Sequence, residues 1–284
     1  MMKMQRKRSI KRGIISGMLF LFLPLLASAQ WFMLQEWPGD RTRITLKFLH
    51  PNLDQTYYYQ KSLSLFSGIY DLSINTPIYN SNGRVNFEAS FPIAINSISN
   101  ETMRGNLYLG IQWKHSRKKN NSIFSVGAYL PTGTDDRWHT FFIAMPTDPI
   151  NFPKYAGKMW DFRVNYLTYA SLGKFELGYE MGLAMSIGDE GYIESIAYLP
   201  YGFYGAFRAG DFTFRTELAG FFVLLGAAGD EDTSIEPSTN SIAVGVRYGR
   251  GSIRPSIFYM RCLTKELRHA VKDALGFQLQ FLLK

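Results

Sequence analysis

The chain has 284 residues, of which 46% are hydrophobic and 15% aromatic, and its 31 Lys and Arg against 23 Asp and Glu give a formal net charge of +8. Six of the basic residues and none of the acidic ones lie in the first 29 residues, so the rest of the chain has a net charge of only +2. The net charge of the whole chain is therefore not evidence for nucleic-acid binding, and the single cysteine, Cys262, excludes an internal disulfide framework.

The N-terminus has the three parts of a secretory signal peptide in the usual order. Residues 1–12 hold six basic side chains, an apolar stretch ends at Leu26, and Ala27-Ser-Ala29 is a small-residue cleavage pattern. The apolar stretch is shorter than the roughly 20 residues of a membrane-spanning helix. We therefore predict that residues 1–29 are a cleaved signal peptide and that residues 30–284 form one exported domain. An uncleaved anchor helix is the alternative.

After the predicted signal peptide, apolar and polar residues alternate in long runs. Clear examples are residues 85–96, 107–114, 175–187 and 275–283. Strict alternation is typical of a strand with one apolar and one polar face. The runs approach the 9–11 residues that a tilted strand needs to cross a bilayer, whereas strands of soluble proteins average about 5–6 residues.

About twelve such strands are predicted, an even number, as in bacterial barrels. Their spans are 41–49, 61–76, 84–96, 104–115, 122–131, 160–171, 174–187, 195–208, 212–226, 241–249, 252–262 and 273–284. Helical patterns are absent apart from a candidate at 265–271.

The links between the predicted strands alternate in length through the C-terminal half. Tight turns fall at Gly173, Gly210 and Gly251, and the longer links fall at 132–159, 188–194, 227–240 and 263–272. A barrel with both termini in the periplasm has short periplasmic turns and long outer loops in this order. The fold class is therefore all-β, a transmembrane antiparallel up-and-down β-barrel in the bacterial outer membrane. A soluble Greek-key sandwich is the alternative.

Aromatic residues on the lipid-facing side cluster beside the predicted periplasmic turns. They are Trp113, Phe124, Phe175, Phe207, Phe212, Phe214, Tyr248 and Phe281. Such rings favour the headgroup level of a membrane, so we interpret them as an aromatic girdle.

Charged residues have the opposite phase and are predicted to face the lumen. They are Glu88, Lys114, Asp161, Arg163, Glu176, Glu180, Arg208, Arg215, Glu217, Arg247 and Arg254. These residues form either a polar solute pathway or a structural ion-pair network that fills a narrow barrel. Neighbouring strands would place Arg163 near Glu176 or Glu180, and Glu180 near Arg208 or Arg215.

The link 132–159 is the candidate gate. Its 28 residues exceed ordinary loop lengths, and its many apolar side chains need burial. We expect it to fold over or into the barrel mouth against inward residues of the strand 212–226. The gate candidates are Trp138, Phe141, Phe142, Phe152 and Tyr155 in the loop, and Phe221 and Val223, followed by Leu225, on the wall.

Enzyme and metal chemistry are not indicated. The histidines His50, His115, His139 and His269 form no metal-spaced cluster, and no nucleophile elbow of the Gly-x-Ser-x-Gly type is present. The acidic stretch 229–236 lacks the spacing of a calcium loop. We therefore expect no catalytic residue, no metal and no cofactor.

Two segments resemble consecutive strands of a known channel family. Gly105-Asn-Leu-Tyr-Leu-Gly-Ile-Gln-Trp113, followed by Ala128-Tyr-Leu-Pro-Thr-Gly133, is similar to transporter-type outer-membrane barrels such as the channels of phenol and aromatic meta-cleavage pathways. In that family a Leu-Pro-Thr-Gly-like turn opens a long outer loop, so the resemblance implies a channel for small apolar or aromatic compounds. Many barrels end on an aromatic residue that the assembly machinery reads, whereas this chain ends Phe281-Leu-Leu-Lys284.

The functional prediction is a gated outer-membrane channel for a small solute. Expected partners are outer-membrane lipid, the solute and the outer-membrane assembly machinery, with no nucleic acid. Only residues 30–40 precede the first predicted strand, so we expect no plug domain and no coupling to an inner-membrane energy source. The alternative is a structural, adhesion or secretion-assembly barrel without transport, and an outer-membrane hydrolase is the least favoured reading.

Overall fold

The computed structural model describes residues 32–36, 40–53, 63–78, 85–117, 120–134, 138–157, 159–188, 195–225 and 238–283. The predicted signal peptide 1–29 and the acidic stretch 229–236 lie outside these residues. Within the described ranges, no helix combines the length and the apolar character needed to cross a membrane.

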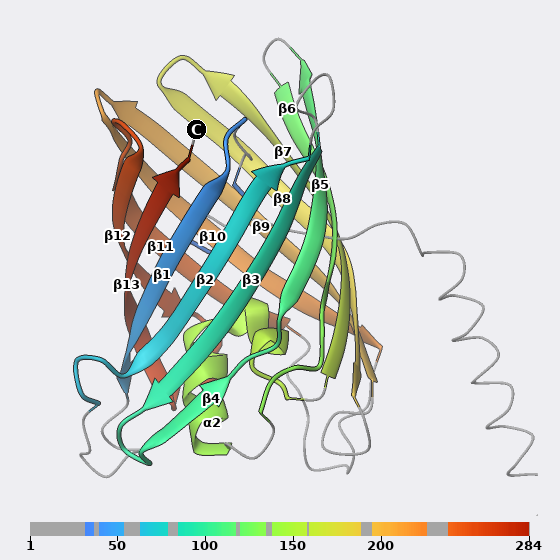
Figure 1. The fold of residues 1–284 in the computed structure, drawn as a ribbon, viewed down its shortest axis with the longest axis vertical. Helices are drawn as coiled ribbons and strands as arrows, with labels where there is room; N and C mark the ends of the chain where they lie inside the picture. The colour runs from blue at the N-terminus through green and yellow to red at the C-terminus, as the bar shows by residue number, and fades with distance from the viewer. Residues whose placement is uncertain are drawn as a thin grey trace, which may run out of the picture.

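The described strands form one antiparallel sheet that closes into a barrel, because β2 pairs with both β1 and β3 (Figure 1). The strands are β1 (Arg43–Leu53), β2 (Gly68–Pro77), β3 (Val85–Asn96), β4 (Glu101–Arg104), β5 (Tyr108–Arg117), β6 (Asn120–Tyr129), β7 (Met159–Leu172), β8 (Phe175–Gly188), β9 (Ser195–Ala209), β10 (Phe212–Leu225), β11 (Ser238–Tyr248), β12 (Ile253–Cys262) and β13 (Val271–Leu282). The short β4 and the longer β5 pair with successive parts of β3 and share one place in the wall. The barrel therefore has twelve strand positions, which confirms the predicted fold class.

The wall alternates between buried and exposed residues as the sequence predicts. In β8, Glu180 is 6% exposed and faces the lumen, whereas its neighbour Met181 is 57% exposed on the outside. Because side chains of a strand point to opposite faces in turn, a slip of one residue would exchange these two environments. The phase of the alternation is thus fixed by the apolar outer face.

We expect Leu183→Arg to destabilise the barrel in bilayers by about 2–4 kcal/mol, since Leu183 lies at mid-strand with the outward parity of Met181. Thr213→Arg is the matched control, because Thr213 lines a polar cavity inside the barrel. Urea unfolding followed by the gel shift of heated and unheated samples measures both. Equal midpoints for the two variants would show that the assigned phase is wrong.

Three tight turns lie at one end of the barrel. Gly173, Gly210 and Gly251 have φ of 67°, 59° and 79°, in the left-handed region that side chains with a Cβ disfavour. The C-terminus lies at this same end, while α2 lies at the other (Figure 1). By the sequence argument the turn end is periplasmic, and we use that name for it below.

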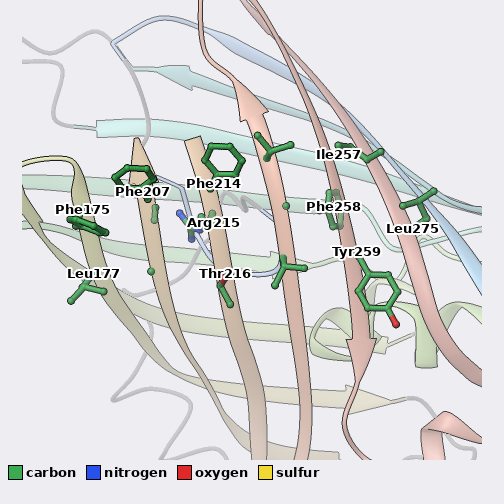
Figure 2. Close-up of a pocket in the computed structure, with 15 residues that line it drawn as sticks. Phe175, Leu177, Phe207, Phe214, Arg215, Thr216, Ile257, Phe258, Tyr259 and Leu275 are labelled. Carbon is green, nitrogen blue, oxygen red and sulfur yellow. The ribbon is translucent and has the colours of Figure 1, made fainter. Parts of the chain in front are cut away.

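The aromatic girdle is present on the outside near the periplasmic turns. Phe175 and Phe207 have ring centroids 5.0 Å apart, and both lie at the edge of an apolar groove of about 700 Å³ in the outer wall (Figure 2). Leu177, Phe214, Ile257 and Leu275 also line this groove. Lipid acyl chains are the natural environment of such a surface.

The lumen is not an open pore, because two chain segments occupy it. Residues 32–36, called the N-terminal insert below, are nearly or fully buried inside the wall. Residues 138–157 are called the loop insert and contain α2 (Trp138–Thr147) and the 3-10 helix η1 (Pro149–Lys154). The loop insert lies toward the end of the barrel opposite the periplasmic turns (Figure 1). The sequence analysis expected no plug domain because only residues 30–40 precede the first strand, yet part of this short segment occupies the lumen.

Helical structure in the long loop was also not predicted. Its prolines, Pro146, Pro149 and Pro153, mask the helical pattern, yet Pro149 lies at the start of η1, where a missing N–H costs little. The helical candidate at 265–271 is confirmed as a single turn, α3 (Lys265–Arg268).

Candidate functional site: a lumen closed by two inserts

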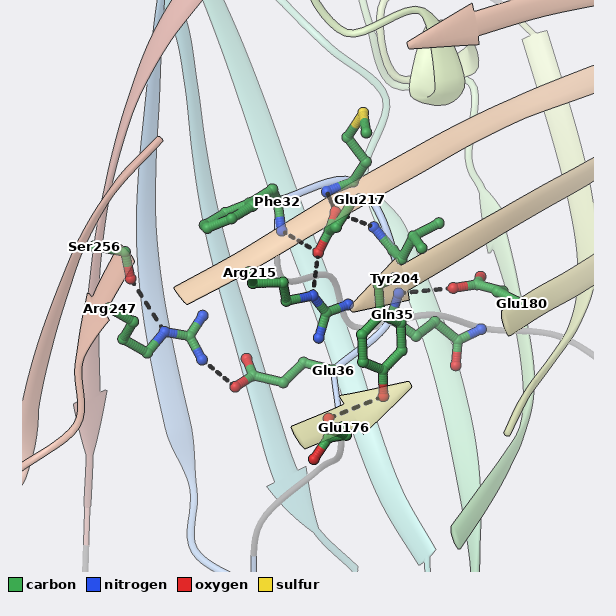
Figure 3. A network of polar contacts seen from close by, with 12 residues as sticks. Phe32, Gln35, Glu36, Glu176, Glu180, Tyr204, Arg215, Glu217, Arg247 and Ser256 are labelled. Atoms are coloured by element: carbon green, nitrogen blue, oxygen red, sulfur yellow. Dashed lines mark hydrogen bonds and ion pairs between the residues drawn. The ribbon is translucent and has the colours of Figure 1, made fainter. Parts of the chain in front are cut away.

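The backbone of the N-terminal insert is held by carboxylates of the wall. Glu217 on β10 accepts hydrogen bonds from the backbone N–H of Phe32, Met33 and Leu34 at 3.4, 2.7 and 3.2 Å (Figure 3). Glu180 on β8 accepts one from Gln35 at 2.7 Å. A segment without secondary structure must satisfy its buried N–H groups elsewhere, and these two side chains do so.

A lysine completes the attachment from the opposite side of the lumen. Lys47 on β1 donates from Nζ to the carbonyl oxygen of Phe32 at 2.7 Å. Arg215 forms an ion pair with Glu217 at 2.6 Å and so offsets the charge of the carboxylate that binds the insert. The attachment is therefore entirely noncovalent and depends on charged groups.

Glycines in the wall make room for the apolar side chains of the insert. A Cβ at residue 202 would lie 2.1 Å from Cδ2 of Leu34, and one at residue 276 would lie 2.2 Å from the ring of Phe258. Phe258 in turn stacks on Phe32, with centroids 4.4 Å apart and an interplanar angle of 18°. Larger residues at Gly202 would thus clash with Leu34, and larger residues at Gly276 would clash with the ring on which Phe32 stacks.

Glu36, the last described residue of the insert, binds an arginine pair. Its carboxylate contacts Arg247 on β11, Arg43 on β1 at 3.0 Å, and Nε2 of Gln280 on β13 at 2.8 Å. Burial raises the pKa of Glu36, but the charges of Arg247 and Arg43 outweigh this effect and hold its pKa at about 2. Glu36 is therefore ionised throughout the neutral pH range.

Next to Glu36 a polar cavity of about 660 Å³ occupies the periplasmic part of the lumen, and we call it the vestibule. Its charged lining consists of Arg41, Arg43, Arg208, Arg215, Arg247 and Arg254 with Glu36, Asp40, Glu176 and Asp211. Arg208 bonds to Glu176 at 3.0 Å, and the guanidinium of Arg215 lies 3.7 Å from the ring centroid of Tyr204. The vestibule is thus a cationic chamber with an aromatic wall.

The loop insert packs against the wall with both apolar and ionic contacts. Phe152 is 4% exposed, and its ring centroid lies 5.6 Å from that of Phe221 and 5.5 Å from that of Tyr198. Lys154 forms an ion pair with Asp71 on β2 at 2.6 Å. Burial lowers the pKa of Lys154, but Asp71 and its other anionic neighbours outweigh this and raise it overall.

Asn106 anchors the end of the loop insert. Its Nδ2 donates to the carbonyl oxygens of Pro153 and Ala156 at 2.8 and 2.6 Å, and its backbone N–H donates to Lys154 at 2.6 Å. Asn106 lies between β4 and β5, where the wall changes strands. One side chain thus connects the barrel wall to the segment that fills it.

The two inserts meet near the middle of the lumen. A cavity of about 10 Å³ is lined by Met33 and Leu34 of the N-terminal insert and by Ile150 and Asn151 of the loop insert. This volume is too small for a solute and marginal even for one water molecule. The described conformation is therefore closed at this level.

The residues predicted to line the lumen do point inward, but several pair differently than expected. Arg163 bonds to Asp161 at 2.5 Å on its own strand, not to Glu176 or Glu180. Arg208 bonds to Glu176 and not to Glu180, and it lies at the periplasmic rim with 64% of its side chain exposed. Glu180 accepts a hydrogen bond from the backbone N–H of Gln35, and the alternation of residues along the strands could not indicate this contact. Of the remaining candidates, Glu88 accepts a hydrogen bond from Gln112 at 3.2 Å, and Lys114 forms an ion pair with Asp40 at 2.8 Å. Glu217 is buried in the lumen, and Arg247 and Arg254 line the vestibule.

The structure describes the side chains of some gate candidates and not of others. Phe152, Tyr155 and Phe221 are buried within one cluster, and Val223 packs against it. The side chains of Trp138, Phe141 and Phe142 lie outside the described residues, although their backbone belongs to α2. Leu225 was wrongly assigned to the lumen. A register shift between Val223 and Leu225 breaks the alternation, and Leu225 is 68% exposed.

Other site residues were missed by sequence reasoning. Glu36 lies before the first predicted strand, and its partner Arg247 is 211 positions away along the chain. Arg43 and Lys47 lie in that strand and bind Glu36 and Phe32 of the preceding segment. The alternation of residues 43–53 would have indicated that Arg43 and Lys47 face inward. Among the described residues, no group of three or more His, Cys, Asp or Glu is placed to hold a metal ion.

No protein-family model and no curated protein matches the chain. Among solved structures, the chain is similar to the COG4313 outer membrane channel from Pseudomonas putida F1, with a TM-score of 0.65, 12% identity, and 90% of this chain and 100% of that one covered. It is also similar to the KdgM porin in complex with disordered oligogalacturonate, with a TM-score of 0.52, 8% identity, and 85% and 99% covered. The chain therefore has the fold of bacterial outer-membrane channels and porins.

Proposed function

We propose that this protein is an outer-membrane channel for a small solute, and that the N-terminal insert and the loop insert are two gates in series. The observation that carries the proposal is the filling of the lumen by two segments whose described contacts with the wall are noncovalent. Wall side chains alone can fill a barrel of about eight strands, and a barrel with twelve strand positions is wider. Here the filling belongs to two segments that can leave as units.

The lining favours a solute with an apolar body and a polar end over a bare ion. Phe152, Tyr198 and Phe221 form an aromatic cluster in the outer part of the lumen, and arginines surround the vestibule in the periplasmic part. A solute that crosses this path meets both environments in turn. This preference agrees with the apolar or aromatic solutes that the sequence resemblance implies.

The competing function is a structural barrel without transport, and the buried ion pairs of the lumen favour it. Arg163 and Asp161, for example, are 2% and 0% exposed and fully paired with Tyr198 and Ser186. Buried networks of this kind also serve to fix a unique packing. Transport measurements separate the two functions.

We expect the channel to open when both gates are removed. A variant lacking residues 138–155 and carrying Gly202→Leu has lost most of the loop insert, and its residue 202 clashes with Leu34 of the N-terminal insert. In liposome swelling with a neutral sugar it should pass solute at least about tenfold faster than the parent protein, since two gates in series must both open. Each single change should give a smaller increase.

The control for this experiment is the folded state of each variant, measured by the gel shift of unheated samples. A double variant that is folded in the liposomes but swells no faster than empty liposomes would exclude the channel and favour the structural barrel.

A further inference from the structure

Glu36 occupies a site built to bind a carboxylate. Three strands contribute, with Arg43 from β1, Arg247 from β11 and Gln280 from β13. Arg247 is held in place by a second hydrogen bond, from its Nε to Oγ of Ser256 at 3.1 Å (Figure 3). Arginines fixed by their own neighbours are well suited to bind carboxylates because their donors are already oriented.

The site has more positive charge than Glu36 neutralises. Arg254 on β12 lies directly opposite Gln280 in the strand register, and it lines the vestibule together with Arg43 and Arg247. Its Nε is buried and has no hydrogen-bond partner among the described residues. Arg43 and Arg247 bind Glu36, and the nearby Arg254 with its unpaired Nε leaves capacity for a further anionic group.

The vestibule offers room for the rest of a ligand. Its volume of about 660 Å³ adjoins the arginines, and Tyr169 and Tyr204 supply an aromatic wall. A flat apolar body could stack there while its carboxylate binds the arginines. A bare inorganic anion would use the charges but not this wall.

We propose that this arginine site binds the carboxylate of the solute, of the small aromatic carboxylate class, and that Glu36 is an internal ligand which the solute displaces. The inference rests on the proposed channel function and names its substrate class. Displacement releases the end of the N-terminal insert, so solute binding and opening of this gate favour one another. Because Glu36 is tethered beside the site, it competes at a high effective concentration and lowers the apparent affinity for the solute.

Calorimetric binding of benzoate to the purified full-length protein tests the proposal, with benzamide as the uncharged analogue and inorganic phosphate as the general anion. We expect Glu36→Gln to bind benzoate at least about tenfold more tightly than the parent, because the internal competitor has lost its charge. Arg254→Gln should bind it at least about tenfold more weakly, as expected when a charged partner is removed. Benzamide should not bind.

A second variant covers the case in which Glu36→Gln fails to fold with its arginines unpaired. Gly202→Leu displaces Leu34 without altering the arginine site, and it should also bind benzoate more tightly than the parent. Unchanged affinity in both variants would overturn the displacement model. Equal binding of benzamide, or binding of phosphate without benzoate, would overturn the carboxylate class.

Failure of this inference is distinguishable from failure of the channel function. A barrel that conducts but binds no benzoate contradicts only the substrate class and the role of Glu36. A barrel that binds benzoate but stays sealed after both inserts are removed contradicts the channel function, and the arginine site would then bind its ligand without transport.

Discussion

Replacing Glu217 with glutamine should release the N-terminal insert from the barrel wall. The carboxylate accepts three backbone hydrogen bonds from the insert and pairs with Arg215, and glutamine keeps its size while losing its charge. Hydrogen bonds to charged groups contribute about 1.5–3 kcal/mol each, against about 0.5–1.5 kcal/mol for neutral ones. A loss of about 3 kcal/mol would lower the ratio of docked to undocked insert by about 100-fold.

The release can be measured by labelling a cysteine in the insert. Leu34→Cys in a Cys262→Ala background is buried when docked, so its reaction with a water-soluble maleimide reports the undocked fraction. Glu217→Gln should speed this labelling by about 100-fold, in proportion to that fraction. The cysteine itself removes the Leu34 contact with Gly202, so all variants are compared in the same Leu34→Cys background.

The matched control is Glu176→Gln. Glu176 is also a wall carboxylate, but it bonds to Tyr204 and Arg208 and not to the insert. Its replacement should leave the labelling rate close to that of the parent. If Glu217→Gln and Glu176→Gln label equally fast, Glu217 does not hold the insert.

Most of the wall could be predicted from the sequence because one physical rule governs it. Each strand has one face in lipid and one in the lumen, so apolar and polar residues alternate with a period of two. The predicted starts and ends of β7, β8, β9 and β10 differ from the observed ones by at most one residue. Alternation ends where the wall is irregular, as at Leu225, and there the prediction was wrong.

The contents of the lumen could not be predicted in the same way. Residues 32–36 show no periodicity, and their main partner, Glu217, lies about 185 positions away in the chain. No pattern in the neighbouring sequence indicates that the N-terminal insert folds into the barrel. The carboxylates that bind it were predicted to face inward, but their role as acceptors for backbone N–H groups depends on a segment that alternation does not describe.

Ion pairs in the lumen illustrate a further limit of the sequence. Parity assigns Arg163 and Glu180 to the same face, but it does not say how far neighbouring strands are shifted along one another. In the barrel Arg163 lies opposite Ala184, and its guanidinium turns to Asp161, two residues away on the same strand. Pairing thus depends on register and on side-chain rotamers, which require the three-dimensional structure.

A reversible disulfide between the N-terminal insert and the wall is the most direct test of the central claim that this insert closes a channel. Cγ of Leu34 lies 3.0 Å from the position of a Cβ at residue 202, and this matches the separation of about 3 Å between the Cβ and the far sulfur of a disulfide bond. Leu34→Cys with Gly202→Cys should therefore crosslink. The pair is placed in a Cys262→Ala background that also lacks residues 138–155, so that the loop insert cannot mask the result.

Planar-bilayer conductance of this variant is then recorded before and after addition of a reductant, with the Leu34→Cys single variant as the control for the reductant itself. The account predicts a closed barrel when the disulfide is formed, and a conductance that appears on reduction and disappears on reoxidation. Equal conductance in the oxidised and reduced states would contradict it, because a crosslinked insert that does not block current cannot be the gate.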